Sequence, residues 1–192
     1  MTRRIYVRHI PWRKSADGGP LGRSVRHDSA SWDYRFDTTG LTLTSVTHVR
    51  RAPVFDQGDL GSCTGEAAAG ILGTEPHWLG FTPSQQGGIN QNLAVGIYSE
   101  ATAIDPFVGQ YPPDDTGPAG LSVAKVLVRH NWSSGYQHTF TPDDALLAGQ
   151  KYPWMLGCDW FEGFDTPDAN GLVKISGKVR GAHEIEMFAI DV

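Results

Sequence analysis

Cysteine is scarce in this sequence: Cys63 and Cys158 are the only two among 192 residues. Two cysteines cannot form the disulfide framework of a small secreted domain, and they are too few for a zinc site built on several thiolates. The sequence therefore predicts a chain that folds without disulfides, and it gives no sign of a metal or of another cofactor.

Long hydrophobic runs are also missing. No stretch approaches the roughly 20 apolar residues that a transmembrane helix needs. The first nine residues, Met1 to His9, are basic but lack the apolar segment of a signal peptide. We therefore expect no membrane partner and a cytoplasmic location, where proteins usually lack disulfides.

An excess of positive charge is the third missing feature. The chain has 16 Lys and Arg against 21 Asp and Glu, a net charge of −5, and no basic stripe. This balance argues against a nucleic-acid partner. With 40% hydrophobic residues, a chain of 192 residues can bury the core of one large or two small domains. The composition indicates a globular protein and leaves its oligomeric state open.

The most informative segment that is present runs from Gln57 to Cys63. Gln57 precedes Cys63 by six residues, glycines lie between them, and small residues predict a helix over residues 63–72. A thiol at a helix N-terminus faces unpaired N–H groups and the positive end of the helix dipole, which favour the thiolate. The N–H of Cys63 and the amide of Gln57 could donate to an oxyanion. The alternative is that Cys63 is a small buried residue without a chemical role.

A nucleophilic cysteine needs a base, and His183 is the best placed of the seven histidines. It follows a flexible turn over residues 177–182 and opens a run over residues 184–190 that is typical of a strand. A histidine at the mouth of a strand could reach across a cleft and take the proton of Cys63. A strand histidine without a role is the alternative, and His27 beside Asp28 is the closest rival. We expect the six histidines other than His183 to lie on the surface.

Two motifs carry a resemblance to a known family. Asp56-Gln57-Gly58 followed by Gly61-Ser62-Cys63, together with Gly181-Ala182-His183 120 residues after the cysteine, resembles the papain-like cysteine peptidases, particularly their bacterial and phage branch. The resemblance spans about residues 25–190. It implies a cysteine endopeptidase that cleaves peptide bonds of a peptide or protein substrate through an acyl-enzyme, in a bacterial or infected host cytoplasm. The catalytic residues that it implies are Cys63, His183 and Gln57.

The same resemblance implies where the substrate binds. The glycine-rich segment over residues 117–120 would line the cleft, with Gly117, Gly120 and Ala182 as substrate-binding residues. A turn that merely precedes a helix is the alternative interpretation of this segment.

The sequence also departs from the family. Leu60 stands where many members have a disulfide cysteine, and Thr64-Gly65 replaces an aromatic-containing pair. The asparagine that orients the histidine in the family lies beyond it, and here nine residues follow His183, none of them Asn or Trp. We therefore expect either a chain cut short of its natural end or a site that has lost its third residue. The alternative functions are a catalytically impaired binding or assembly module and a cell-wall amide hydrolase.

The order of the expected elements predicts the fold class. A short strand is expected over residues 46–49, a loop over residues 76–88, and further helices over residues 89–103, 121–130 and 141–149. Strands of one sheet are expected over residues 152–158, 172–175 and 185–190. Helices followed by strands predict an α+β protein. The resemblance implies a two-lobed papain-like fold without its C-terminal strands, divided into an N-terminal extension with a β-lobe strand (1–53), a helical lobe (54–137) and an antiparallel β lobe with His183 (138–192).

Overall fold

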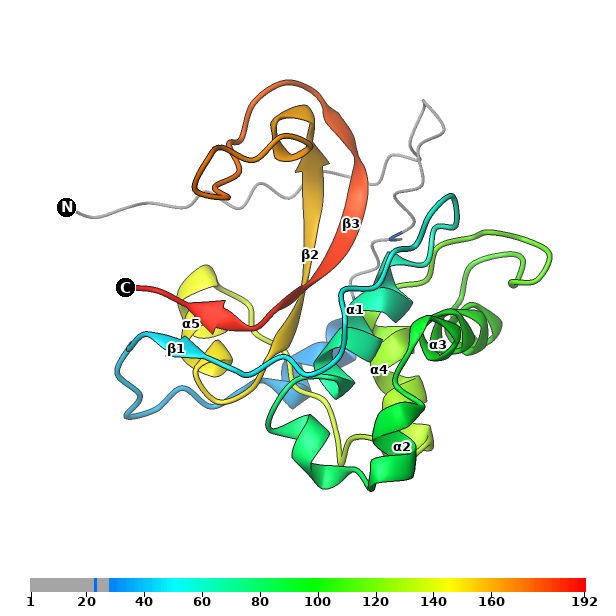
Figure 1. Ribbon diagram of the computed structural model, residues 1–192, viewed down its shortest axis with the longest axis horizontal. Coiled ribbons are helices and arrows are strands. Elements are labelled where there is room, and N and C mark those ends of the chain that lie inside the picture. Colours follow the sequence, from blue (N-terminus) through cyan, green and yellow to red (C-terminus); the bar gives the residue numbers. More distant parts are fainter. Residues whose placement is uncertain (1–22, 24–27) are drawn as a thin grey trace.

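The computed structural model describes Arg23 and residues 28–192, and in these residues it contains helices and short antiparallel strands (Figure 1). The α-helices are α1 (Cys63–Leu72), α2 (Pro83–Gly87), α3 (Gln91–Ile104), α4 (Gly120–Arg129) and α5 (Pro142–Gly149). The strands are β1 (Val46–Thr47), β2 (Trp154–Phe161), β3 (Val179–Met187) and β4 (Ala189–Ile190). The 3-10 helices are η1 (Ser29–Tyr34), η2 (His77–Gly80) and η3 (Glu162–Phe164). The predicted α+β class is confirmed, and no helix of these residues is long and apolar enough to cross a membrane.

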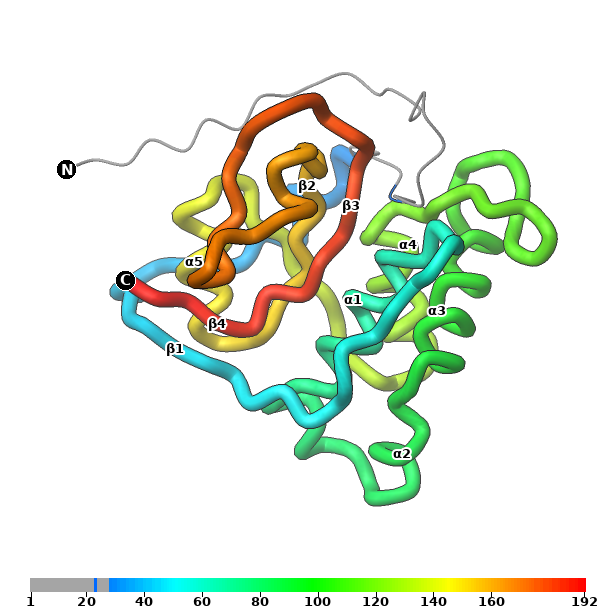
Figure 2. The backbone as a smooth tube through the Cα atoms, turned by 45° about the horizontal axis from the view of Figure 1, so that its top comes forward, coloured from blue at the N-terminus to red at the C-terminus, as the bar shows by residue number. Residues whose placement is uncertain are grey.

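Helix α1 lies at the centre of the molecule. It packs against α3 and α4 on one side and against β3 on the other (Figure 2). Its small residues allow this close approach: a Cβ at Gly65 would collide with the carbonyl oxygen of Ala94, and one at Gly70 with the carboxylate of Glu186. The small-residue run after Cys63 is therefore a packing requirement of the central helix.

The hydrophobic core is shared by α1, α3 and α4. Its members with less than 2% of their surface exposed include Leu72, Ile97, Val123 and Val126. In α3 the buried residues recur with helical spacing, and the Asn90 side chain caps the helix by accepting from the N–H groups of Asn92 and Leu93. The predicted helices over 63–72, 89–103, 121–130 and 141–149 are confirmed, with small shifts at their ends.

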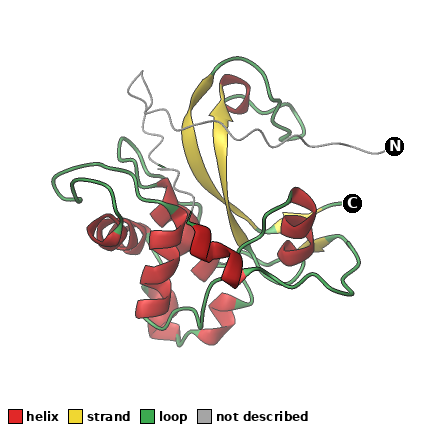
Figure 3. Ribbon diagram, turned by 180° about the vertical axis from the view of Figure 1, so that it is seen from behind, coloured by secondary structure: helices red, strands yellow, loops and turns green. Residues whose placement is uncertain are grey.

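The strands form two sheets of two strands each, so the prediction of a single sheet is wrong. β2 pairs with β3 in a long antiparallel ribbon, and β1 pairs with β4 (Figure 3). The predicted strand over residues 172–175 is wrong as well. Those residues form an exposed part of the β2–β3 connection, because no neighbouring strand supplies hydrogen-bond partners there.

β3 begins earlier than the sequence indicates. Residues 179–182, predicted as a turn, continue the ladder with β2: Gly181 lies opposite Trp160, and Ala182 opposite Asp159. His183 is therefore the fifth residue of a nine-residue strand, and the prediction that it lies at a strand mouth is wrong.

The loop predicted over residues 76–88 contains the short helices η2 and α2. Helix α2 begins with a capping box: Thr82 accepts from the N–H of Gln85, and the Gln85 side chain accepts from the N–H of Thr82. This Thr-Pro-Ser-Gln pattern is a local start signal that the turn-rich surroundings concealed.

Candidate active site

Cys63 is the first residue of α1 and is buried, with 1% of its surface exposed. The preceding residue, Ser62, makes no side-chain cap of the helix and instead donates its hydroxyl to Oε1 of Glu66 at 2.9 Å. The first N–H groups of a helix have no acceptor within the helix, and the dipole adds partial positive charge there. The thiol thus lies at the end of α1 that stabilises a thiolate.

The loop before Cys63 is held by a chain of hydrogen bonds to α3. The N–H of Asp56 donates to Oε1 of Gln91 at 3.0 Å, and Nε2 of Gln91 donates to Oε1 of Glu66 at 2.7 Å. Burial raises the pKa of Glu66, and the hydrogen bonds from Ser62 and Gln91 act in the opposite direction. The loop and the first turn of α1 are thereby fixed to one another.

Gln57, the predicted oxyanion donor, helps to close this loop. Its side-chain Nε2 donates to the carbonyl oxygen of Leu60 at 2.9 Å, while the N–H of Leu60 donates back to the carbonyl oxygen of Gln57 at 3.1 Å. One hydrogen of the amide is therefore used to shape the loop. Its role toward an oxyanion stays a prediction.

A second set of hydrogen bonds joins the loop to the glycine-rich segment over residues 117–120. The N–H of Gly61 donates to Oδ2 of Asp115 at 2.8 Å, and the hydroxyl of Tyr98 donates to Oδ1 of the same carboxylate. The N–H of Gly117, whose φ is +66°, donates to the Tyr98 oxygen at 3.4 Å. Burial and the contact with Asp115 raise the pKa of Tyr98, which keeps its phenol protonated. Asp115 and Tyr98 therefore link the loop of Cys63 to the predicted substrate-binding segment.

His183 lies in the middle of β3 and is half-buried. Among the described residues, the buried Nδ1 of His183 has no hydrogen-bond partner. The imidazole instead meets the Trp160 ring edge-on, with ring centroids 4.8 Å apart. Burial lowers the pKa of His183, which favours the neutral imidazole.

Strand alternation explains this placement. Glu184 lies against Gly120 of α4, and Glu186 lies against Gly70 of α1, so both face the helices. Side chains alternate between the two faces of a strand, which puts His183 on the opposite face. The pairing of Cys63 with His183 stays a prediction that requires the imidazole to move.

Two predicted substrate-binding residues border a buried ion pair. The carbonyl oxygen of Ala182 accepts from the backbone N–H of Arg23 at 3.3 Å, and Nε of Arg23 lies 2.5 Å from Oε2 of Glu184. Gly120 lies beside the other oxygen of this carboxylate. The structure thus groups Ala182, Gly120 and Glu184, a residue that the sequence did not single out.

Glu186 is the second acidic side chain that the sequence did not single out. Its carboxylate accepts from Arg50 and from the hydroxyl of Thr74, the latter at 2.6 Å. An acidic residue beside an apolar one in a strand indicates a solvent-facing position, and no local pattern identifies a partner 136 residues away. Only the arrangement of α1 against β3 identifies these inward-facing carboxylates.

The other histidines are placed outside this group. His130 is exposed, as predicted, and its Nε2 lies 2.9 Å from Oε1 of Glu100. His48, His77 and His138 were also predicted to be surface residues, but their side chains are half-buried. Burial lowers the pKa of His77 and of His138. His9 and the rival base His27 lie outside the described residues.

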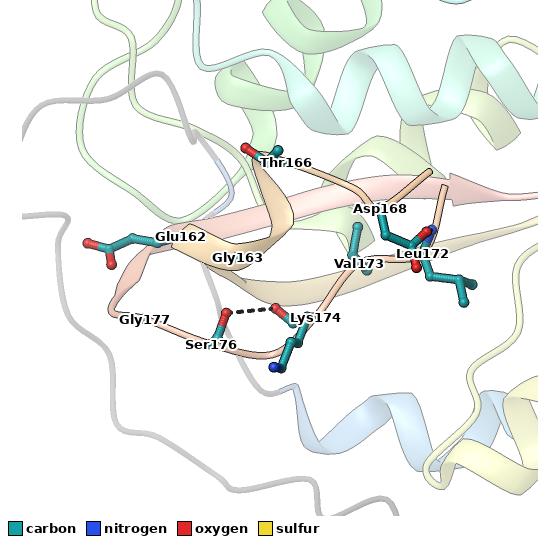
Figure 4. Close-up of a pocket in the computed structure, with 9 residues that line it drawn as sticks. All are labelled: Glu162, Gly163, Thr166, Asp168, Leu172, Val173, Lys174, Ser176 and Gly177. Atoms are coloured by element: carbon teal, nitrogen blue, oxygen red, sulfur yellow. Dashed lines mark hydrogen bonds between the residues drawn. The ribbon is translucent and has the colours of Figure 1, made fainter. Parts of the chain in front are cut away.

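A depression that does not include Cys63 lies in the connection between β2 and β3 (Figure 4). It measures about 570 Å³ and contains no cysteine or histidine; its lining is Glu162, Gly163, Thr166, Asp168, Leu172, Val173, Lys174, Ser176 and Gly177. In the described part of the chain, no group of three or more His, Cys, Asp or Glu side chains could hold a metal ion. The loop of Cys63 and its surroundings therefore remain the candidate site.

Comparison of the chain with protein-family models, with curated proteins and with solved structures found no match. The functional interpretation therefore depends on the residues and contacts described above.

Proposed function

We propose that this chain is a papain-like cysteine peptidase, a hydrolase that cleaves peptide bonds through an acyl-enzyme on Cys63. The position of Cys63 as the first residue of the central helix carries the proposal. Hydrogen bonds from the loop to Gln91 and to Asp115 support it, because a nucleophile must be held in a fixed geometry.

In the proposed reaction, the neutral imidazole of His183 takes the proton of the thiol, and the thiolate attacks the carbonyl carbon of the substrate. The carbon–nitrogen bond then breaks while the imidazolium returns its proton to the leaving amine. Water, activated by the same imidazole, hydrolyses the thioester. Burial lowers the pKa of His183, which supports its role as the neutral base. This role requires the imidazole to move from the face of β3 opposite the helices toward Cys63.

Oxyanion stabilisation is assigned to the N–H of Cys63 and to the Gln57 amide. The side-chain amide of Gln57 also donates to the carbonyl oxygen of Leu60, which holds it in the loop before Cys63. The packing of α1, α3 and α4 beside the β2–β3 ribbon is compatible with a helical lobe and a β lobe, which is the papain-like arrangement that we propose.

One observation favours a second function, a binding or assembly module without turnover. Cys63 is only 1% exposed, so little of its thiol is open to a substrate. In this second function, Cys63 and His183 contribute to the fold alone.

The two functions are separated by labelling with the thiol-reactive epoxide E-64 at neutral pH, followed by mass spectrometry. The matched variants are Cys63→Ser and Cys158→Ser, which each leave one thiol. We expect stoichiometric labelling of the wild type and of Cys158→Ser, and none of Cys63→Ser. A Cys63 that stays unlabelled in the folded protein would refute the peptidase proposal.

The substrate class is tested separately. Turnover of casein is expected for an endopeptidase, whereas turnover of peptidoglycan stem peptides alone would indicate a cell-wall amide hydrolase. Cys63→Ser is the control for both assays, because a contaminating hydrolase would remain active in it.

A further inference from the structure

Glu184 and Arg23 form an ion pair on the face of β3 that is turned toward α4. The Glu184 side chain has 5% of its surface exposed, and its Oε2 lies 2.5 Å from Nε of Arg23. Burial raises the pKa of Glu184, while the guanidinium of Arg23 acts in the opposite direction. A carboxylate at this depth needs a cation or a proton beside it.

Two glycines create the space for the guanidinium and the carboxylate. Gly157 lies directly opposite Glu184 in the β2–β3 ladder, and a Cβ at this position would overlap with Cζ and Nε of Arg23. At the start of α4, a Cβ on Gly120 would lie 3.1 Å from Oε1 of Glu184. The guanidinium of Arg23 and the carboxylate of Glu184 thus occupy space that side chains at these two positions would fill.

The backbone of Arg23 is held at the same place as its side chain. The backbone N–H of Arg23 donates to the carbonyl oxygen of Ala182 at 3.3 Å, one residue before His183 and two before Glu184. A peptide residue is thereby held at two points, by its N–H and by its guanidinium. This is a peptide-binding arrangement, since a free guanidinium compound would use only one of the two contacts.

We propose that Glu184, Gly157, Gly120 and the Ala182 carbonyl form an arginine-binding pocket for peptides, and that Arg23 is its intramolecular occupant. An arginine residue of another peptide competes with Arg23 for this pocket. The planar guanidinium lies over Gly157 beside the carboxylate, a geometry that the compact ammonium of lysine does not reproduce. Binding at this pocket requires no chemistry of Cys63, so the inference does not depend on the peptidase proposal.

The test is calorimetric titration of the Arg23→Ala variant with N-acetyl-arginine amide and with N-acetyl-lysine amide. Removal of the internal competitor is expected to tighten arginine binding by about tenfold or more over the wild type. The lysine compound is expected to bind at least about tenfold more weakly than the arginine compound. Equal binding of the two compounds, or no gain in Arg23→Ala, would overturn the proposal.

Two further variants in the Arg23→Ala background locate the binding. Glu184→Gln removes the charge, and Gly157→Ala keeps the carboxylate but fills the space of the guanidinium, so each is expected to abolish binding. Gly135→Ala is the matched control, because a Cβ there meets nothing within 4 Å. Undiminished binding by Gly157→Ala would contradict the assigned pocket.

Folding of Arg23→Ala is checked by its thermal unfolding with each compound present. A ligand that binds only the native state raises the unfolding midpoint. We expect N-acetyl-arginine amide, and not the lysine compound, to raise the midpoint or to restore folding. A variant that stays unfolded with the arginine compound would show that Arg23 is only a structural ion-pair partner, and the proposal would fail.

Discussion

Single residues determine the chemistry that the candidate site can perform. Cys63, Gln57 and His183 were identified from the sequence because each belongs to a short local motif. Glu184 and Glu186 were not, because nothing near them in the sequence marks a buried charge. Their partners Arg23 and Arg50 lie far away in the chain and are brought to them by the packing of β3 on the helices.

Replacement of the thiol tests the nucleophile. Cys63→Ser should leave the fold intact, because the hydroxyl has almost the same size, and should abolish peptide hydrolysis, because a serine hydroxyl has no comparable ionised population at neutral pH. The measurements are turnover and urea unfolding of the wild type and the variant. Turnover at the wild-type rate would exclude Cys63 as the nucleophile.

Removal of the Gln57 amide tests the oxyanion donor. Gln57→Ala should lower kcat by roughly 10²–10³, the typical effect of losing one such donor. The change also removes the bond to the Leu60 carbonyl oxygen, so the unfolding free energy is measured in parallel. A kcat that is unchanged in a folded variant would remove Gln57 from the site.

The buried imidazole of His183 gives a pH dependence of stability. Burial lowers its pKa below the ordinary value of 6.5, so the unfolded chain binds a proton more readily than the folded one. The contribution of His183 to stability is therefore complete above pH 6.5 and is lost as the pH falls below this value toward the folded pKa.

His183→Gln isolates this effect. The half-buried His77 and His138, whose pKa values are also lowered by burial, contribute equally to both proteins. We expect the unfolding free energy of the wild type to fall more steeply below pH 6.5 than that of the variant, as measured by urea denaturation. Parallel curves would show that the pKa of His183 is the same in both states.

Among the elements, helices were predicted better than strands. α1, α3, α4 and α5 follow from local periodicity and caps such as Asn90 and Thr141. The strand over residues 172–175 was wrong and the start of β3 was misplaced, because strand formation depends on a partner that the local sequence does not show. Gly149 is the last residue of α5. A glycine is needed at this position because a Cβ there would collide with the Trp154 ring.

The close packing of α1 on α3 predicts opposite effects of two Gly→Ala changes. Gly65→Ala should destabilise the protein by roughly 1–3 kcal/mol, because its Cβ would collide with the backbone oxygen of Ala94. Gly96→Ala in α3 meets nothing within 4 Å and should stabilise by about 1 kcal/mol through helix propensity. Urea unfolding measures both. A stabilising Gly65→Ala would contradict the described contact between the helices.

At the scale of the whole molecule, α1 contributes to the helical core with α3 and α4 and also packs against the β2–β3 ribbon. The α+β class could be predicted from the order of the elements. The inward charges of β3 and the face that His183 occupies could not, because they depend on how distant segments pack and on the register of the ladder.

The proposed peptidase function requires a reactive thiolate at Cys63 that is paired with His183. The most direct test is the pH dependence of alkylation by iodoacetamide in Cys158→Ser, with and without His183→Gln. We expect fast alkylation of Cys63 at pH values well below the ordinary thiol pKa of about 8.5, and a rise of the apparent pKa toward that value in the His183→Gln variant. An alkylation rate that rises only near pH 8.5 and is the same in both proteins would contradict it.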